Sequence, residues 1–303
     1  MNKYEGEVRK RSQTLLIVEG DHEKNDLFWL IFRCFPEINI DMDNVWIYGT
    51  NIYLLYEDIV KEYGSDWADE EMDIDLPFVI SKKQTPDNPR YKDDFTNIIL
   101  VFDYERHDPN FSEIKILKLQ NIFSDATDMG KLYINYPMIE SYQHLTAIPD
   151  HEFAERKIPV SLRPGSKYKE QVGKESVIKW IVEFPHRIDD LMKERYEITD
   201  MQNRKECCEK ILCLSDVDCM EKRLQEILQF SATEDRRKTL KYQLKDWISR
   251  VGYVNNGQTF ESLDPVKILN KQNICSNTED GFIWVLNTCV FVVADYNFLL
   301  LQS

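Results

Sequence analysis

Thr14-Leu-Leu-Ile-Val-Glu-Gly-Asp-His-Glu23 joins a short apolar run to a glycine that acidic residues flank on both sides. The run from Thr14 to Val18 is too short for a core helix, so it predicts a buried strand of a parallel sheet. Gly20 allows a sharp turn, and apolar residues three and four positions apart predict a helix over residues 21–35. Glu19 is therefore expected just outside the carboxyl end of a strand, where open α/β sheets bind their ligands.

Two later apolar runs repeat this arrangement. Residues 97–102 are followed by Asp103 and Glu105, whose spacing directs both carboxylates to one face of a continuing strand. Residues 132–136 form a third apolar run, and Glu140 follows it four positions later. Three strands that each end in an acid predict that these carboxylates converge.

Convergent carboxylates in a dry cleft cannot all ionise without a cation. Hard oxygen ligands of this kind favour Mg²⁺ or Mn²⁺ over zinc. Such ions polarise a phosphoryl oxygen and activate water or a hydroxyl group for attack on phosphorus. The sequence therefore predicts a Mg²⁺ or Mn²⁺ site suited to phosphate chemistry.

Strand and helix patterns alternate along the first half of the chain. They predict strands at 14–18, 44–48, 97–102 and 132–136, and helices at 21–35, 51–62 and 112–126. This order predicts an α/β fold with a mostly parallel sheet flanked by helices. Helical spacing after residue 150 predicts a largely helical C-terminal domain. We expect residues 1–150 to form the catalytic domain and residues 151–303 the helical one.

Two segments interrupt or end this pattern. Residues 63–96 form an acidic, proline-containing insertion in which residues 78–80 predict a short strand. The apolar segment 282–301 predicts a buried helix rather than a membrane span, because it carries several polar residues. With 303 residues, of which 43% are hydrophobic, the chain is long enough to bury a large core.

The motif Val18-Glu-Gly-Asp-His-Glu23, followed by Asp103-Tyr-Glu105 on a later strand, resembles the Toprim domain of primases, topoisomerases and OLD-family nucleases. With the segment around Glu140 and the length of the chain, it looks most like the AriB family, the stand-alone Toprim nucleases of PARIS-type anti-phage defence systems. The motifs lie within roughly residues 10–150, and beyond them the resemblance rests on length and helical character.

The resemblance implies roles for five acids. Glu19 matches the essential first-strand glutamate, which assists proton transfer or binds metal, and Glu23 matches the second acid of that motif. Asp103 and Glu105 match the Asp-x-Asp metal ligands, with Asp103 also catalytic, and Glu140 matches a further acid. The extra methylene of Glu105 leaves open whether it is a direct ligand, and Asp108 is a nearby substitute.

The chain carries 38 Lys and Arg against 53 Asp and Glu, a net charge of −15, and most of the acidic excess lies in residues 1–150. An acidic protein repels nucleic acid, so a nuclease of this kind needs a local basic surface. The segment richest in Lys and Arg is residues 156–174, which we interpret as this basic surface. The alternative interpretation of the segment is a solvated linker. Its candidate nucleic-acid-binding residues are Arg156, Lys157, Arg163, Lys167, Tyr168, Lys169 and Lys174, with Tyr168 available to stack a base.

The expected function is that of a metal-dependent nuclease, a phosphodiesterase. The resemblance implies a toxic effector of abortive infection that cleaves host tRNA or other RNA once an AriA-like ATPase partner releases it. No P-loop motif occurs in the chain, so any ATP dependence is expected to come from that partner. The alternatives are a DNA-nicking Toprim or OLD-type nuclease and a catalytically degenerate Toprim binding or regulatory module. Whether the active form is a homodimer stays open.

Cysteine usage and hydropathy predict the compartment. The seven cysteines form no Cys-x-x-Cys pair, so they predict packing roles in a reduced protein. Residues 1–12 are polar and do not resemble a secretory signal. A cytoplasmic protein with no membrane association is therefore expected.

Overall fold

The computed structural model describes residues 13–28, 31–32, 37–38, 40–68, 72–146, 150, 152–163, 165–176 and 264–296. The chain divides into two compact units. Unit 1 comprises residues 1–20, 40–102 and 110–133, and unit 2 comprises residues 21–39, 103–109 and 134–303. The predicted boundary at residue 150 stays a prediction, because residues 177–263 lie outside the described residues.

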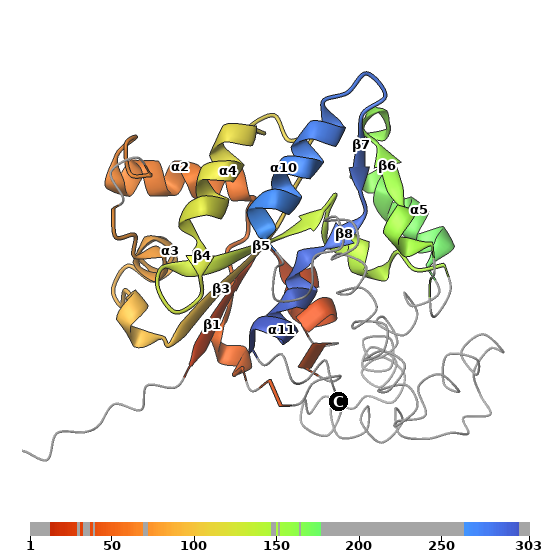
Figure 1. The fold of residues 1–303 in the computed structure, drawn as a ribbon. Helices are drawn as coiled ribbons and strands as arrows, with labels where there is room; N and C mark the ends of the chain where they lie inside the picture. The colour runs from red at the N-terminus through yellow and green to blue at the C-terminus, as the bar shows by residue number, and fades with distance from the viewer. Residues whose placement is uncertain are drawn as a thin grey trace, which may run out of the picture. The chain divides into compact units, whose positions relative to one another are not determined.

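A mostly parallel sheet forms the centre of unit 1 (Figure 1). Strand β1 (Thr14–Val18) is fully buried and pairs in parallel with β2 (Val45–Ile47) and with β3 (Asn97–Asp103). The sheet continues to β5 (Gly130–Tyr136), which pairs antiparallel with β4 (Ser124–Asp125). The predicted strands at 14–18, 44–48, 97–102 and 132–136 all correspond to strands of this sheet.

Three α-helices of unit 1 flank the sheet: α2 (Ile52–Tyr63), α3 (Leu76–Gln84) and α4 (Glu113–Ile122). The side chain of Asn51 accepts a hydrogen bond from the backbone N–H of Leu54, so it caps the first turn of α2. Ser112 caps α4 in the same way by accepting from the N–H of Lys115. The predicted mixed α/β fold, with a mostly parallel sheet flanked by helices, is confirmed at this level.

The predicted strand at residues 78–80 is wrong, because these residues belong to helix α3. Asp75 caps this helix by accepting from the N–H of Phe78, and Pro77 occupies its first turn, where its missing N–H costs nothing. The helix-capping residue Asp75 therefore outweighed the three consecutive apolar residues 78–80, which had predicted a strand. The described part of the insertion contains α3 and the 3₁₀ turn η3 (Lys92–Asp94).

The described residues of unit 2 form short helical turns, helices and strands. Residues 21–28 and 31–32 are helical, with a π-helical turn η1 (Glu23–Phe28), and the rest of the predicted helix 21–35 lies outside the described residues. The other elements used below are η4 (Ile139–Gln143), β6 (Lys157–Pro159), η6 (Val160–Leu162), α5 (Ser166–Glu175) and α10 (Pro265–Ser276).

Residues 282–296 of the segment predicted as one helix over 282–301 instead form two strands and short helices, and residues 297–301 lie outside the described residues. Strand β7 (Phe282–Trp284) pairs with β6, and β8 (Leu286–Asn287) pairs with Asn135 and Tyr136 of β5. Two short turns follow, η8 (Thr288–Phe291) and α11 (Val292–Tyr296). The prediction failed because both strand partners lie more than a hundred residues earlier, where no local pattern reveals them. In the part of the chain that the structure describes, no helix is long and apolar enough to cross a membrane.

Gly130 gives a first test of the fold. Its φ is +125°, and a Cβ there would lie 2.7 Å from Leu100 Cδ1 and 3.2 Å from Ile98 Cγ2. We expect Gly130→Ala to lower the free energy of unfolding by about 1–3 kcal/mol, through backbone strain and overpacking together. Gly64→Ala is the matched control in urea unfolding, because Gly64 also has a positive φ but no atom within 4 Å of its added Cβ. Equal losses in the two variants would contradict the packing part of this expectation.

Candidate functional site

Three acids of unit 2 come from three different elements. Asp103 is the last residue of β3 and is 4% exposed, and Glu23 is the first residue of η1 and is 3% exposed. Glu140 lies on η4, with its side chain 14% exposed. We refer to Glu23, Asp103 and Glu140 as the carboxylate centre, because the charges of all three raise the pKa of one lysine, Lys169. Lys169 of α5 places its Nζ 3.1 Å from Glu140 Oε1.

The electrostatics of Lys169 connect the three acids. Burial alone would lower the pKa of Lys169, but Glu140, Asp103 and Glu23 outweigh burial, so this pKa lies above its ordinary value. Lys169 therefore stays charged at neutral pH. With the three acids ionised, the group carries two net negative charges, which a divalent cation would neutralise. The sequence placed Glu23, Asp103 and Glu140 in one site, and all three lie within electrostatic range of the same ammonium group.

The donor chemistry of the carboxylate centre fits Mg²⁺ or Mn²⁺. Glu140 Oε2 is buried and has no hydrogen-bond partner in the structure, a state that polar atoms in proteins rarely keep unless they meet a ligand. Hard carboxylate oxygens are the ligands these ions prefer. Among the described residues, however, no three or more His, Cys, Asp or Glu side chains are already arranged to hold a metal ion. Lys169 rather than a preformed ligand cage neutralises Glu140 in this conformation.

Two buried residues that sequence reasoning missed lie beside these acids. The side-chain amide of Asn135 on β5 donates to Asp103 Oδ1 over 3.0 Å and so fixes the orientation of that carboxylate. The thiol of Cys289 is 3.2 Å from Asn135 Oδ1, and burial followed by the charges of Glu23 and Asp103 raises its pKa well above the usual value. A signal for Asn135 existed, because an asparagine inside an apolar strand needs a polar partner.

Glu19 and Glu105 are placed separately. Glu19 belongs to unit 1, where its backbone N–H donates to the Val101 carbonyl over 3.1 Å and its own carbonyl accepts from Gly49 N–H over 2.9 Å. Glu105 belongs to unit 2 and has a positive φ of 39°. Both side chains are half-buried. Their roles as catalytic residue or metal ligand stay predictions of the sequence.

The segment 156–174 contains β6, η6 and α5 rather than a solvated linker, and its candidate nucleic-acid-binding residues have different surroundings. Lys169 pairs with Glu140, and Lys174 pairs with Glu170 over 2.6 Å. Tyr168 is fully buried, so its ring offers no face for a base to stack on in this structure. The exposed members of the set are Lys157, Arg163, Lys167, Lys169 and Lys174, of which the last two form the ion pairs given above.

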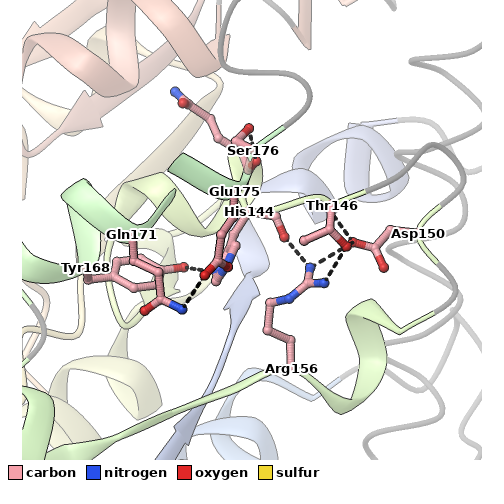
Figure 2. Close-up of polar contacts among 9 residues, drawn as sticks. His144, Thr146, Asp150, Arg156, Tyr168, Gln171, Glu175 and Ser176 are labelled. Carbon is pink, nitrogen blue, oxygen red and sulfur yellow. Dashed lines mark hydrogen bonds and ion pairs between the residues drawn. The ribbon is translucent and has the colours of Figure 1, made fainter. Parts of the chain in front are cut away.

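His144 holds helix α5 against the end of η4 (Figure 2). It is 1% exposed, and its Nδ1 lies 3.2 Å from the Tyr168 hydroxyl while its Nε2 lies 2.8 Å from Glu175 Oε2. Burial lowers the pKa of His144, which favours the neutral ring. Nε2–H then donates to Glu175, and Nδ1 accepts from Tyr168. Because Tyr168 and Glu175 lie two turns apart on α5, this double contact fixes the helix that brings Lys169 to Glu140.

Arg156 and Asp150 form a buried ion pair in the same network (Figure 2). Arg156 Nη1 lies 2.8 Å from Asp150 Oδ2, with the two side chains 12% and 2% exposed. Arg156 also donates to the carbonyl of His144 and, over 3.0 Å, to Thr146 Oγ1. The ion pair therefore supports the backbone of His144. The predicted nucleic-acid contact of Arg156 competes with this internal role.

Comparisons of the chain with protein-family models, with curated proteins and with solved structures find no match.

Proposed function

We propose that this chain is a metal-dependent nuclease whose carboxylate centre holds Mg²⁺ or Mn²⁺. The observation that carries the proposal is the carboxylate of Glu140, which pairs with Lys169 through Oε1 and leaves Oε2 buried without a partner. Two further acids, Glu23 and Asp103, are almost fully buried, and their charges raise the pKa of the same lysine. Each of the three acids lies at or just after the end of a strand in the chain, the region where open α/β sheets bind their ligands, which supports a functional site.

The residues of the carboxylate centre and their neighbours would have different roles in catalysis. A cation held by Glu23, Asp103 and Glu140 would polarise a phosphoryl oxygen and favour ionisation of an attacking water. Asn135 keeps the carboxylate of Asp103 in one orientation. Lys169 is kept charged by the acids around it, so its ammonium group can pair with a phosphate oxygen that gains negative charge during cleavage.

The resemblance to Toprim domains extends the proposal. It assigns proton transfer or metal binding to Glu19 and leaves Glu105 as a further ligand. The likeness to AriB effectors of PARIS-type systems adds host tRNA or other RNA as the substrate and an AriA-like ATPase as the partner that restrains the nuclease. A DNA-nicking Toprim or OLD-type enzyme is the alternative within the same chemistry. Incubating the protein with total tRNA and with plasmid, each with Mg²⁺ or Mn²⁺, separates these two.

One observation favours a second candidate function, a degenerate binding module without catalysis. Lys169 already pairs with Glu140, and no metal-holding group is preformed among the described residues. In that case the lysine is the permanent counterion of the acids, and the carboxylate centre stabilises the fold. The two candidates differ in whether the protein binds a divalent cation.

Glu140→Gln tests this difference. We expect the wild-type protein to bind Mn²⁺ in isothermal titration calorimetry and the variant to bind it about tenfold more weakly, because one anionic donor is lost while the shape is kept. Glu170→Gln is the control, because Glu170 is an exposed acid that pairs with a lysine of the same helix. Wild-type protein that binds no Mn²⁺ at millimolar concentration, and cleaves neither RNA nor DNA, would support the degenerate module instead.

A further inference from the structure

Strands β6 and β7 of unit 2 form a two-stranded antiparallel sheet whose two faces differ (Figure 1). Ile158 and Ile283 lie opposite each other in this sheet and are 2% and 0% exposed. Because side chains alternate between the faces of a strand, their neighbours Lys157, Phe282 and Trp284 lie on the other face. Lys157 is exposed, and the two aromatic side chains are half-buried. The outer face of the sheet therefore presents two aromatic rings and a lysine.

Two lysines lie over these rings. Lys157 Nζ is 4.5 Å from the centre of the Phe282 ring and 5.7 Å from that of the Trp284 ring. Lys271 of α10 also places its Nζ 5.7 Å from the centre of the Trp284 ring. The two rings contact each other edge to face, with their centres 5.4 Å apart. Among the described residues no carboxylate forms an ion pair with Lys157, so its charge is available to an anion.

Hydrogen bonds hold the backbone of Trp284 in place. Its N–H donates to Gln272 Oε1 over 2.9 Å, and its carbonyl accepts from Gln272 Nε2 over 3.0 Å. Gln272 is itself 2% exposed. On the other side, the N–H of Val285 donates to the Arg156 carbonyl over 3.0 Å. The strand that carries the rings is therefore fixed on both sides, as a preorganised binding surface requires.

A short piece of chain joins β7 to the strands that hold the carboxylate centre. Trp284 precedes Asn287 of β8 by three positions, which span at most about 11 Å of extended chain. Asn287 pairs with Asn135 of β5, whose side chain donates to Asp103. The aromatic face and the carboxylate centre therefore belong to neighbouring parts of unit 2.

We propose that this outer face binds a single strand of nucleic acid by stacking on its bases. We call it the stacking platform, and it consists of Lys157, Lys271, Phe282 and Trp284. Aromatic side chains stack on unpaired bases, and lysines beside them pair with the phosphates. A stacked base is worth more than an exposed contact between a lysine and a ring, so the ammonium groups can turn to the phosphates while a base takes their place.

Charge favours one end of the stacking platform. Glu279 and Asp280 are exposed acids just before β7, and they would repel a phosphate near Phe282. Lys157 and Lys271 both lie over Trp284, so we expect the phosphate contacts at that end. Resting on the proposed nuclease function, we assign the ligand as an unpaired stretch of the RNA substrate that lies beside the bond that is cut.

Binding without metal tests the stacking platform separately from cleavage. The measurement is fluorescence anisotropy of a labelled single-stranded RNA, in EDTA, with the wild-type protein, Trp284→Leu and Trp284→Phe. Leucine keeps an apolar side chain but offers no ring, so we expect Trp284→Leu to bind RNA about tenfold more weakly. Phenylalanine restores a ring, and Trp284→Phe should recover most of the affinity. Phe78→Leu is the control, because Phe78 is also a half-buried ring beneath a lysine but is already stacked on Tyr91.

An abasic strand separates stacking from phosphate contacts. This strand has the sugar–phosphate backbone without bases, so Trp284→Leu should bind it as tightly as the wild-type protein does. Lys157→Gln should instead weaken binding of both strands and reduce the salt dependence of affinity. Lys61→Gln on α2 is the control for the same loss of charge.

Three results would contradict the inference. Wild-type RNA affinity in a Trp284→Leu protein that circular dichroism shows to be folded would overturn the stacking platform. Equal losses with the normal and the abasic strand would exclude stacking on bases. Tighter binding of single-stranded DNA of the same sequence would overturn the assignment to RNA. If Trp284→Leu does not fold, Phe282→Leu takes its place in both measurements, with the same expected results.

These outcomes also separate this inference from the proposed function. Weaker RNA binding by Trp284→Leu, in a wild-type protein that cleaves nothing with Mn²⁺, would support the stacking platform while removing the nuclease. Unchanged RNA binding by that variant, in a wild-type protein that cleaves RNA with Mn²⁺, would remove the stacking platform and leave the nuclease intact.

Discussion

Asp103→Asn is expected to reduce metal-dependent RNA cleavage by at least about a hundredfold while leaving the protein folded. The carboxylate lies at the end of β3, is 4% exposed and accepts a hydrogen bond from Asn135 over 3.0 Å. An asparagine has the same shape and can accept the same hydrogen bond, so the substitution removes mainly the charge that would hold the cation. Initial rates of tRNA cleavage in Mg²⁺ and in Mn²⁺ provide the measurement.

The control for this experiment is Asp93→Asn, the same chemical change at an exposed position on η3 of unit 1. Circular dichroism and the urea midpoint establish that both variants fold. A folded Asp103→Asn protein that cleaves at the wild-type rate would show that Asp103 is not part of the reaction. Equal losses in both variants would point to a general effect of charge on RNA binding.

Asp150→Asn is expected to lower the free energy of unfolding by about 3 kcal/mol at neutral pH. The substitution leaves the guanidinium group of Arg156 largely buried without its charged partner, since the two side chains are 12% and 2% exposed. Removing one partner of a buried ion pair leaves a buried charge without compensation. The stability lost in this way is larger than the stability that the intact pair contributes relative to apolar residues at the same two positions. Urea unfolding gives the value. Lys82→Gln is the control, because it breaks an exposed pair with Glu62 and is expected to cost no more than about 0.5 kcal/mol.

The cost of Asp150→Asn should depend on pH. Burial would raise the pKa of Asp150, but hydrogen bonds from Arg156 and from the N–H of Thr146 outweigh burial and hold this pKa below its ordinary value of 3.8. A carboxyl group with a lowered pKa in the folded state contributes stability above that ordinary value and loses it as the pH falls through the folded-state pKa. The difference between wild type and variant should therefore be constant near neutrality and shrink below about pH 4. A constant difference down to pH 3 would contradict the ion-pair explanation.

Local sequence patterns predicted the strands that carry the acids. The run from Thr14 to Val18 is fully buried, as an uninterrupted apolar strand of a parallel sheet should be. Residues 97–102 and 132–136 also form strands. Glu19, Asp103, Glu105 and Glu140 were grouped in advance because strand ends at one edge of a parallel sheet lie together, whereas Glu23 was added through the resemblance to Toprim domains. The strand predictions succeeded because apolar runs depend on neighbouring residues, and the grouping of the acids in one metal site stays a prediction.

Other features depended on partners far away in the chain. Residues 282–284 and 286–287 became strands because Ile158 and Asn135 offered backbone partners more than a hundred residues earlier. Lys169 and Tyr168 looked like a nucleic-acid surface in the sequence, yet one pairs with Glu140 and the other is buried against His144. No spacing rule links these residues, because their contacts arise only when η4 and α5 pack together.

The sequence by itself determined the α/β pattern and the acids that follow its strands, since short-range periodicity suffices for these, while the kind of cation that the acids would bind stays a prediction. Only the tertiary structure decided that Lys169 neutralises Glu140 and that Asn135 orients Asp103. The physical reason is that burial and ion pairing are properties of three-dimensional surroundings. Residues far apart in the chain supply those surroundings, and no local pattern in the sequence records them.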